Sequence, residues 1–353
     1  MPEGRKLTKD DLQKILQIGK VDVGNDTLFS RTDKLHVDKT HLTLVISSGG
    51  SGATAIKEAI ATAKQKLEED FSVYMKFIMI DSASKELDAL AKSLGRKQLQ
   101  ILNISTDGAQ GRMHVKQRPD FYRKFVPEDY DITKLNKDGS SRDRMTGKIK
   151  FYDDAVGGNY NDVVFRGMIS SLFADGGDWS THRDKPVDIM VLAGLSGGNG
   201  SGTFEELAAH ARYACEQAGA ATRVFGYLFL PDTVEEWEKS NPTNQKMLYT
   251  NGYAALKELE SYMSIRFNPE RREYFYSRDG VTTIECSAEK PLFDYPVLIS
   301  GGYNESKSMM AESILNLAVE STGTFDQDSF YSNTITAREA YLNDVVNLNG
   351  GLL

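Results

Sequence analysis

The sequence predicts an α/β fold of three layers, in which a mostly parallel, Rossmann-like sheet carries helices on both faces. Strand-like apolar runs alternate with helical patterns along the chain, and this alternation is typical of strands joined by helical crossovers. Glycine-rich segments follow two of the expected strands, at residues 49–52 and 194–202. A length of 353 residues, 40% of them hydrophobic, supplies a core large enough for such a domain.

The first half of the chain is predicted to run strand, helix, strand, helix, strand. Residues 41–46 are rich in β-branched and aliphatic side chains, as in a buried strand. In residues 53–70, apolar side chains recur at steps of three and four, which indicates a helix. A strand at 74–80, a helix at 85–94 and a strand at 100–104 follow, so this half favours parallel pairing.

The second half continues the alternation. A helix at 162–173 precedes an apolar strand at 187–192, and Thr203 with Glu206 is interpreted as the capping box of a helix that ends at Gly219. The remaining elements are expected to be a strand at 224–230, a helix at 251–263, a strand at 295–299, and helices at 305–320 and 335–346.

Two segments interrupt this pattern and are interpreted as insertions. Residues 106–150 are rich in charge and carry turn residues at 137–140, so we expect a partly exposed insertion there. Residues 264–290 contain Arg-Asp-Gly-Val at 278–281 between alternating runs, which predicts a β-hairpin with a type I′ turn.

The composition excludes several classes of protein. A balance of 42 basic and 50 acidic residues, net −8, argues against a chain that coats nucleic acid or an anionic membrane. The sequence has no apolar run long enough to span a bilayer and no apolar signal core at its N-terminus, so a cytoplasmic location is expected. Cys215 and Cys286 are too few for a zinc site or a disulfide framework.

The two glycine-rich segments carry the functional signal. Glycine lets the backbone approach a phosphate closely, and the free N–H groups and dipole of the following helix then face the negative charge. One such segment is often only a tight connection. Two in one sheet, the second with five glycines from Gly194 to Gly202, favour a nucleotide-binding site.

Other readings of these segments are less complete. Residues 50–55 fit G-x-G-x-x-A and the second strand ends in Asp81, which favours a dinucleotide fold but leaves the second segment without a role. Residues 194–198 also fit the G-x-S-x-G elbow of hydrolases. Because the only histidine after Ser196, His210, falls on the very next helix, we interpret that match as accidental.

The order of the loops resembles the tubulin/FtsZ superfamily. Residues 196–202, Ser-Gly-Gly-Asn-Gly-Ser-Gly, are similar to the family's GGGTGSG signature loop, with Ser and Asn at two positions. Residues 49–52 resemble its first phosphate loop, and Asp81 with Ser82 falls in the place of the loop near the nucleotide's metal.

Three further positions extend the resemblance. Residues 155–159, Ala-Val-Gly-Gly-Asn, resemble the family's loop at the terminal phosphate, and Asp232 with Glu236 resembles its D-T-V-x-E ribose loop. Asn304 falls where the family keeps a guanine-reading asparagine, although turn chemistry explains it equally well. The residues that the resemblance implies for nucleotide binding are Gly49, Gly50, Ser51, Gly52, Asp81, Ser82, Ala155, Gly157, Gly158, Asn159, Ser196, Gly197, Gly198, Asn199, Gly200, Ser201, Gly202, Asp232, Glu236 and Asn304.

The catalytic part of the resemblance is weaker. In the family, an acid on a loop after a long central helix enters the nucleotide site of the next subunit and positions the attacking water. Asp344 lies near the expected place, with Asp326 and Asp328 as alternatives, and the sequence does not choose among them.

The resemblance also implies a domain plan. Residues 1–40 are expected to be an N-terminal extension, and residues 41–324 a tubulin-like nucleotide-binding domain that holds both insertions. Residues 325–353 are expected to be the central-helix region, with the family's second domain missing.

The resemblance implies a GTP/GDP-binding protein with Mg²⁺ between the phosphates and Asp81 near the metal. It implies a cytoplasmic bacterial GTPase that assembles with itself, head to tail, into cytoskeletal filaments, with an accessory protein as a further partner. Activity is expected to need assembly and a loop at or beyond the chain end. Two alternatives stay open: a nucleotide-binding switch or scaffold without hydrolysis, and an NAD(P)-dependent oxidoreductase.

Overall fold

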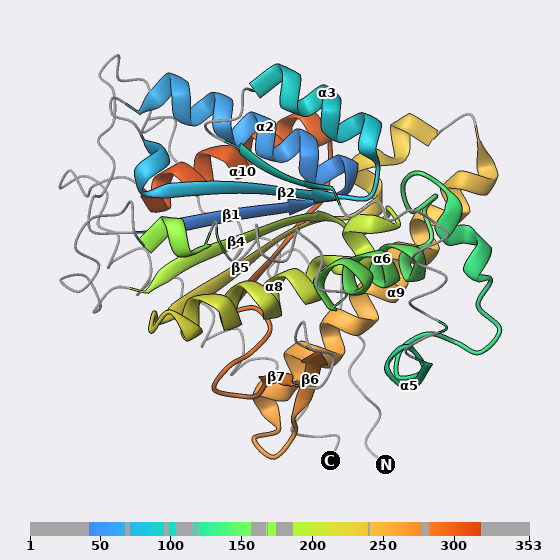
Figure 1. Cartoon of the computed structure of the whole chain (residues 1–353). Helices are drawn as coiled ribbons and strands as arrows, with labels where there is room; N and C mark the ends of the chain where they lie inside the picture. The colour runs from blue at the N-terminus through green and yellow to red at the C-terminus, as the bar shows by residue number, and fades with distance from the viewer. Residues whose placement is uncertain are drawn as a thin grey trace, which may run out of the picture.

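A six-stranded, fully parallel sheet forms the centre of the protein (Figure 1). The computed structural model describes residues 42–67, 71–94, 99–103, 116, 119–156, 167, 169–173, 186–238, 241–276 and 282–318. In chain order the sheet strands are β1 (Thr43–Ser48), β2 (Met75–Asp81), β3 (Leu99–Asn103), β4 (Val187–Gly194), β5 (Thr222–Phe229) and β8 (Tyr295–Ile299).

The strand order is β3-β2-β1-β4-β5-β8, which is the doubly wound order of Rossmann folds. The chain leaves β1 toward β2 on one side and later returns to β4 on the other side. The sheet therefore has a topological switch point between β1 and β4, where folds of this type bind ligands at the carboxyl ends of the strands. The predicted fold class is confirmed.

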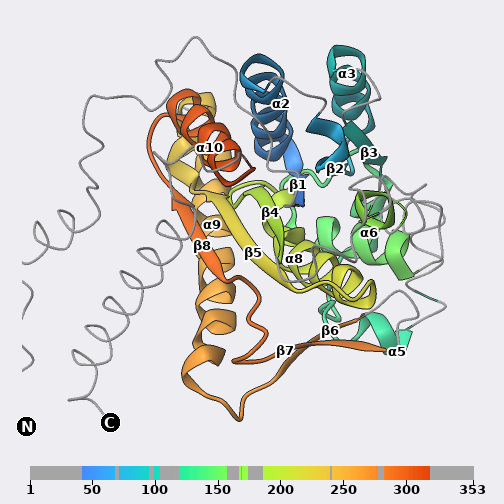
Figure 2. The same cartoon turned by 90° about the vertical axis from the view of Figure 1, so that its left-hand side faces the viewer.

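Helices cover both faces of the sheet (Figures 1 and 2). One face carries α2 (Gly49–Lys66), α3 (Ser84–Leu94) and α10 (Tyr303–Ala318), and the other carries α6 (Arg144–Val156), α8 (Asn199–Gln217) and α9 (Pro242–Met263). Each face has its own hydrophobic core: Leu44 and Ile46 of β1 point into one, and Val45 between them points into the other. The strands are consequently apolar on both sides, as buried parallel strands are.

Three helices begin earlier than their sequence patterns predict. α2 begins at Gly49, so residues 49–52 form its first turn. α8 begins at Asn199, so residues 199–202 of the second glycine-rich segment form its first turn, whereas residues 195–198 connect β4 to it. The predicted capping box is wrong, because the Thr203 hydroxyl donates to the Asn199 carbonyl (2.9 Å) inside α8. α9 begins at Pro242, where the preceding Asn241 caps it with its side chain.

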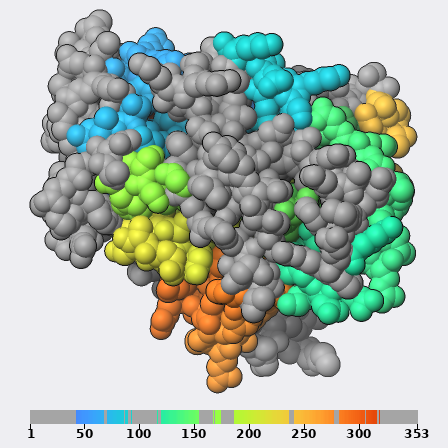
Figure 3. Space-filling model, in the orientation of Figure 1, coloured from blue at the N-terminus to red at the C-terminus, as the bar shows by residue number. Residues whose placement is uncertain are grey.

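The segment predicted to be a partly exposed insertion is, in its described part, exposed at most positions of 127–138 and buried at several aromatic and aliphatic side chains. Its described part contains α5 (Pro119–Tyr122), the 3-10 helix η2 (Ile132–Asn136) and α6, and Leu135 and Ile149 are fully buried. It forms the right-hand side of the domain in the space-filling view (green, Figure 3). The Phe121 ring packs edge-on against Tyr276, 5.3 Å between centroids, which joins α5 to the predicted hairpin.

The hairpin is confirmed as an antiparallel pair of β6 (Glu273–Tyr276) and β7 (Thr283–Cys286). The structure also has three further 3-10 helices: η1 (Phe71–Val73), η4 (Pro231–Glu238) and η5 (Ser264–Phe267). The predicted turn at 278–281, the helix at 335–346, and the segments 1–40 and 325–353 lie outside the described residues. Within the described part of the chain, no helix is long and apolar enough to cross a membrane.

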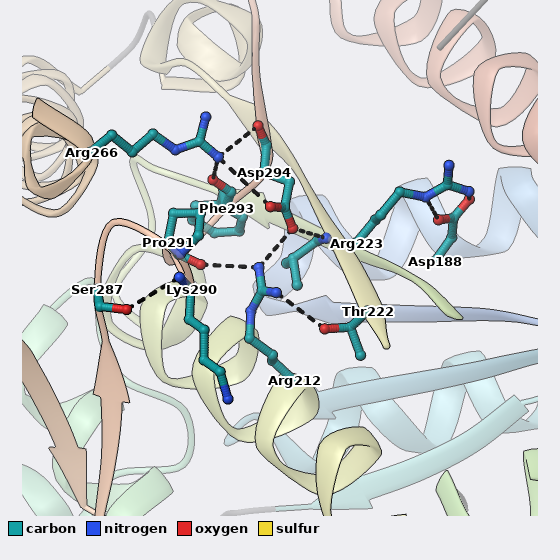
Figure 4. A network of polar contacts seen from close by, with 11 residues as sticks. Asp188, Arg212, Thr222, Arg223, Arg266, Ser287, Lys290, Pro291, Phe293 and Asp294 are labelled. Carbon is teal, nitrogen blue, oxygen red and sulfur yellow. Dashed lines mark hydrogen bonds and ion pairs between the residues drawn. The ribbon is translucent and has the colours of Figure 1, made fainter. Parts of the chain in front are cut away.

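An ion-pair network ties the helices to the amino ends of the strands, opposite the switch point (Figure 4). The carboxylate of Asp294, just before β8, accepts from the Arg212 guanidinium (2.7 Å) and from the backbone N–H of Val224 (2.8 Å). Arg266 approaches the same carboxylate at 3.7 Å, and Arg212 also donates to the Pro291 carbonyl. One carboxylate thus joins α8, β5 and the segment that leads into β8.

We expect Asp294→Ala to lower the free energy of unfolding by about 2–4 kcal/mol, because it leaves two largely buried guanidinium groups with fewer partners. Urea denaturation measures the change. Lys290→Ala is the control, since it removes only an exposed pair with Glu216 and should cost less than about 1 kcal/mol. Equal losses for both variants would contradict a structural role of the network.

Candidate functional site

A cavity of about 520 Å³ opens at the switch point, above the carboxyl ends of β1 and β4. Its wall combines the ends of the strands, the first turns of two helices and a loop that precedes α6. The lining residues are Ser48, Gly49, Gly50, Ser51, Asp81, Ala83, Lys85, Asp138, Gly139, Ser140, Ser141, Arg142, Gly194, Ser196, Gly197, Gly198, Asn199, Gly200, Val234 and Leu248.

The N-termini of α2 and α8 both meet this cavity. The N-cap residues, Ser48 and Gly198, make no side-chain capping hydrogen bond, and neither first turn contains an acidic residue. The first N–H groups of a helix have no partner within the helix, and the helix dipole places partial positive charge at this end. Two such ends that converge on one cavity form a site for an anion that carries several charges.

Close backbone packing explains most of the glycines. Gly49 has a left-handed backbone (φ +75°), and a Cβ there would lie 2.9 Å from the Gly200 nitrogen, so the two helix starts touch backbone to backbone. A Cβ on Gly200 would lie 2.8 Å from the Gly194 carbonyl oxygen, and one on Gly202 would overlap the Arg144 carbonyl of α6. Gly197 differs from these, because a Cβ there would meet nothing within 4 Å.

Polar side chains under the cavity fix the two helix starts. The Asn199 amide donates to the Ser48 hydroxyl (3.0 Å), the Ser48 and Thr203 hydroxyls are 2.7 Å apart, and the Ser82 hydroxyl donates to Asn199 (3.4 Å). These groups are buried and satisfy each other across β1, β2 and α8. Of these four side chains, Ser48 and Asn199 line the cavity, whereas Ser82 and Thr203 lie behind its wall and hold Asn199 and Ser48.

Asp81 lies at the end of β2, buried and in the cavity wall. One of its carboxylate oxygens accepts the backbone N–H groups of Ser82 (2.6 Å) and Ala83 (3.2 Å). These bonds hold the carboxylate in place at the cavity edge. Among the described residues, no group of three or more His, Cys, Asp or Glu side chains gathers as a metal site.

Several predicted site residues lie away from the cavity wall. Asp232 accepts from the Ser300 hydroxyl (2.5 Å) and the Gly301 N–H (2.9 Å), so it braces the loop after β5 against the loop after β8. Asn304 is exposed in the first turn of α10. Other predicted residues that do not line the cavity are Gly52, Ser201, Gly202 and Glu236.

The predicted loop at 155–159 is not part of the cavity wall as far as the structure describes it. Ala155 lies in the last turn of α6, eleven residues after Arg144, which places it about 16 Å along the helix from the end that meets the cavity. Gly157, Gly158 and Asn159 lie outside the described residues, as do Asp326, Asp328 and Asp344.

The loop at residues 138–142, just before α6, lines the cavity. From the sequence, only turn residues at 137–140 were predicted here. The Gly139 N–H donates to the Ser82 carbonyl (2.8 Å), and the buried Lys150 ammonium donates to the carbonyls of Lys137 (2.6 Å) and Gly139 (2.9 Å). Burial lowers the pKa of Lys150, an effect that Asp138 and Asp81 oppose. The loop is thus fixed from below by a side chain of the helix that follows it.

Asn251 of α9 joins this loop to the start of α8. Its amide donates to the carbonyls of Arg142 (2.9 Å) and Ser196 (3.0 Å), so a single side chain fixes the two neighbouring parts of the cavity wall. No sequence motif marks this residue, because its partners lie 109 and 55 positions away.

We expect Asn251→Ala to weaken binding of a ligand in the cavity by about 10-fold, because both wall segments lose a hydrogen bond of about 1 kcal/mol. Asn251→Asp keeps the shape but removes both donated bonds, and so should weaken binding at least as much. Titration calorimetry measures the affinity. Asn244→Ala, in the first turn of the same helix, is the control. Wild-type affinity in both Asn251 variants would contradict the role of Asn251.

A buried charge cluster lies behind the cavity, between α6, α8 and α9. The Lys148 ammonium is 2.7 Å from Glu206 and 3.7 Å from Glu205, and Arg144 pairs with Glu258 while donating to the Ser201 carbonyl (2.7 Å). Burial raises the pKa of Glu205 well above its usual range; Lys148 opposes this shift and Glu258 adds to it. The cluster connects the glycine-rich start of α8 to both neighbouring helices.

Comparison with known proteins identifies a family that matches this chain. A family model described as tubulin-like matches residues 44–343. No curated protein matches the chain.

The chain is also similar to several solved structures. One is CetZ2 from Haloferax volcanii in a GTPγS-bound protofilament, at 16% identity and a TM-score of 0.40 over 78% of this chain and 58% of that one. Another is a GTPγS-form protofilament of Bacillus thuringiensis serovar israelensis TubZ, at 12% identity and a TM-score of 0.40 over 80% and 59% of the two chains. FtsZ of M. jannaschii follows at 13% identity and 0.37 over 88% and 57%. The chain therefore spans less than two thirds of each of these proteins.

Proposed function

The chain belongs to the tubulin-like family, and from that premise we propose that it binds GTP and assembles with itself into head-to-tail filaments. The convergence of two uncapped helix N-termini on one cavity carries the proposal. Backbone N–H groups bind the phosphates in this arrangement, so the net charge of −8 is no obstacle.

The cavity has the size and polarity that a nucleotide needs. About 520 Å³ falls within the range of small-ligand sites. Its two large apolar lining side chains, Val234 and Leu248, come from the segments after β5 and supply a surface for a base. Mg²⁺ keeps most of its waters and binds through one or two carboxylates together with phosphate oxygens. Asp81 fits that requirement as the carboxylate at the cavity edge.

In the proposed reaction, water attacks the terminal phosphate, and the chain contributes positioning and stabilisation of charge. We propose that the acid that orients the water enters from the next subunit of the filament. Asp344, Asp326 and Asp328 are the candidates for this role. A binding protein without turnover, acting as a switch or scaffold, is the alternative in which this acid is not supplied.

An oxidoreductase is less well supported. The strand order and Asp81 at the end of β2 suit a dinucleotide fold. That reading uses only the start of α2, whereas residues 196–200 form an equal part of the cavity wall. Membership of the tubulin-like family favours a nucleoside triphosphate over a dinucleotide as the ligand.

The proposal is tested by identifying what the purified protein binds. We expect mass spectrometry of the released ligand to find GDP or GTP, and titration of the emptied protein to show tighter binding of GTP than of ATP or NAD⁺. Sedimentation with a slowly hydrolysed GTP analogue should pellet the protein. Bound NAD(P) would overturn the assignment, and nucleotide binding without pelleting or phosphate release would leave the switch as the function.

A further inference from the structure

We propose that Arg142 supplies the cationic group that distinguishes a nucleoside triphosphate from a diphosphate in this cavity. The inference rests on the proposed function and names a residue that neither glycine-rich segment contains. Arg142 and Lys85 are the two cationic residues among those that line the cavity. Of these, Lys85 is exposed, whereas Arg142 is half-buried.

The charged residues of the wall gather on one side of the switch point. Asp81 ends β2 and Lys85 follows it, and the loop 138–142 is attached there because the Ser84 N–H donates to the Asp138 carboxylate (3.0 Å). β2 and β5 lie on opposite sides of the β1–β4 pair, and the two large apolar lining residues, Val234 and Leu248, follow β5. A nucleotide across the helix N-termini therefore directs its base toward Val234 and its outermost phosphate toward the charged side.

The backbone at Arg142 is held in an unfavourable conformation. Ser141 (φ 49°) and Arg142 (φ 63°) are the two non-glycine residues with a left-handed backbone in the part of the chain that the structure describes. Such a conformation has a free-energy cost for a residue with a Cβ, and persists where the surroundings enforce it, which is common at ligand sites. Glycine would remove the cost, so the presence of arginine here indicates a use for its side chain.

The surroundings enforce this conformation from several directions. The Arg142 carbonyl accepts from Asn251, and the Asp143 N–H donates to the Ser140 carbonyl (2.9 Å). Gly198, at the start of α8, packs against the same backbone so closely that a Cβ there would overlap Ser140. The arginine is thus presented beside the helix N-terminus by a fixed loop. A guanidinium can donate two parallel hydrogen bonds to a phosphate, which suits a terminal phosphate with its extra charge.

The test measures the affinities of GTP and GDP by calorimetry for the wild type and three variants. Arg142→Ala removes the guanidinium and keeps the backbone cost, Arg142→Gly removes both, and Arg142→Lys keeps the charge. All three keep the carbonyl that Asn251 binds. We expect the alanine and glycine variants to lose about 10- to 100-fold in GTP affinity, the worth of one charged hydrogen-bonded contact, and little in GDP affinity. Lysine should recover part of the loss, and Arg142→Gly should melt at or above the wild-type temperature.

Arg123→Ala is the matched control, because it removes the same charge from a side chain that is 71% exposed and outside the cavity wall. A wild-type preference for GTP retained in both Arg142→Ala and Arg142→Gly would overturn the role of Arg142 while leaving the proposed function intact. If GTP affinity falls in Arg142→Ala but not in Arg142→Gly, the fall comes from the backbone and not from the loss of the guanidinium. That outcome would also overturn the role of Arg142. A wild-type protein that binds neither nucleotide would overturn the proposed function, and this inference with it.

Discussion

Gly197→Val is expected to abolish nucleotide binding and to leave the melting temperature almost unchanged. Gly197 lines the cavity just before α8, and a Cβ there would meet no atom within 4 Å apart from its own chain neighbours. A valine would therefore occupy the space in which the proposed phosphates lie, without straining the fold. We expect a loss of affinity of about 100-fold or more, equivalent to about 2.7 kcal/mol, and a change in stability within about 0.5 kcal/mol.

Two other glycine variants make this result interpretable. Gly167→Val also adds a side chain in open space, but outside the cavity wall, and should leave affinity unchanged. Gly202→Val should instead destabilise the protein severely, because its Cβ would overlap the Arg144 carbonyl and separate α8 from α6. Titration calorimetry and thermal unfolding of the three proteins separate the outcomes. Normal nucleotide affinity in Gly197→Val would show that the N-terminus of α8 does not face the ligand.

Lys148→Met is expected to destabilise the protein by about 3–5 kcal/mol, as the loss of one partner of a buried ion pair does. Lys148 is the cation nearest to Glu205 and Glu206, whose side chains are 4% and 1% exposed. Methionine fills a similar volume but leaves these carboxylates with only Arg144 nearby. Denaturation in urea at pH 7 measures the loss, and Lys257→Met, which removes an exposed pair with Glu260, is the control with an expected change below about 1 kcal/mol.

Glu205→Gln is expected to act in the opposite direction and to stabilise the protein by about 1 kcal/mol at pH 7. The cluster holds the carboxylates of Glu205, Glu206 and Glu258 against two cations, so Glu205 is the uncompensated charge. Its pKa is raised in the folded state, first by burial and then by Glu258 and Glu206, against the effect of Lys148. A neutral side chain at this position removes the cost of burying that charge.

The sign of the pH dependence follows from the raised pKa. Between the ordinary value of 4.5 and the higher folded value, the native state binds more protons at Glu205 than the unfolded state does. The stability contributed by this residue is therefore complete below pH 4.5 and is lost as the pH rises through the folded pKa. The advantage of Glu205→Gln should accordingly vanish at the acidic end of this range. A constant advantage at all pH values would contradict the assignment to Glu205.

The strands of the sheet could be predicted from the sequence, but the cavity wall at residues 138–142 and the helix α6 that follows it could not. Strands β1, β4 and β5 are buried on both faces, so their apolar runs are continuous and easily read. Helix α6 was not predicted, because its buried face includes Lys148 and Lys150, whose charges resemble those of an exposed segment. Their partners are glutamates of α8 and carbonyls of the preceding loop, and no local pattern reveals such pairing.

By itself, the sequence determined the order of the sheet strands along the chain and the two glycine-rich segments that follow β1 and β4, because apolar periodicity and glycine spacing are local properties of the chain. The tertiary structure alone decided which glycine faces the cavity and which faces another backbone. It also decided that residues 138–142 line the cavity, that Asn251 holds this loop against the start of α8, and that Ala155 lies at the far end of α6. The physical reason is that close backbone approach and the burial of a charged group both depend on elements far apart in the sequence.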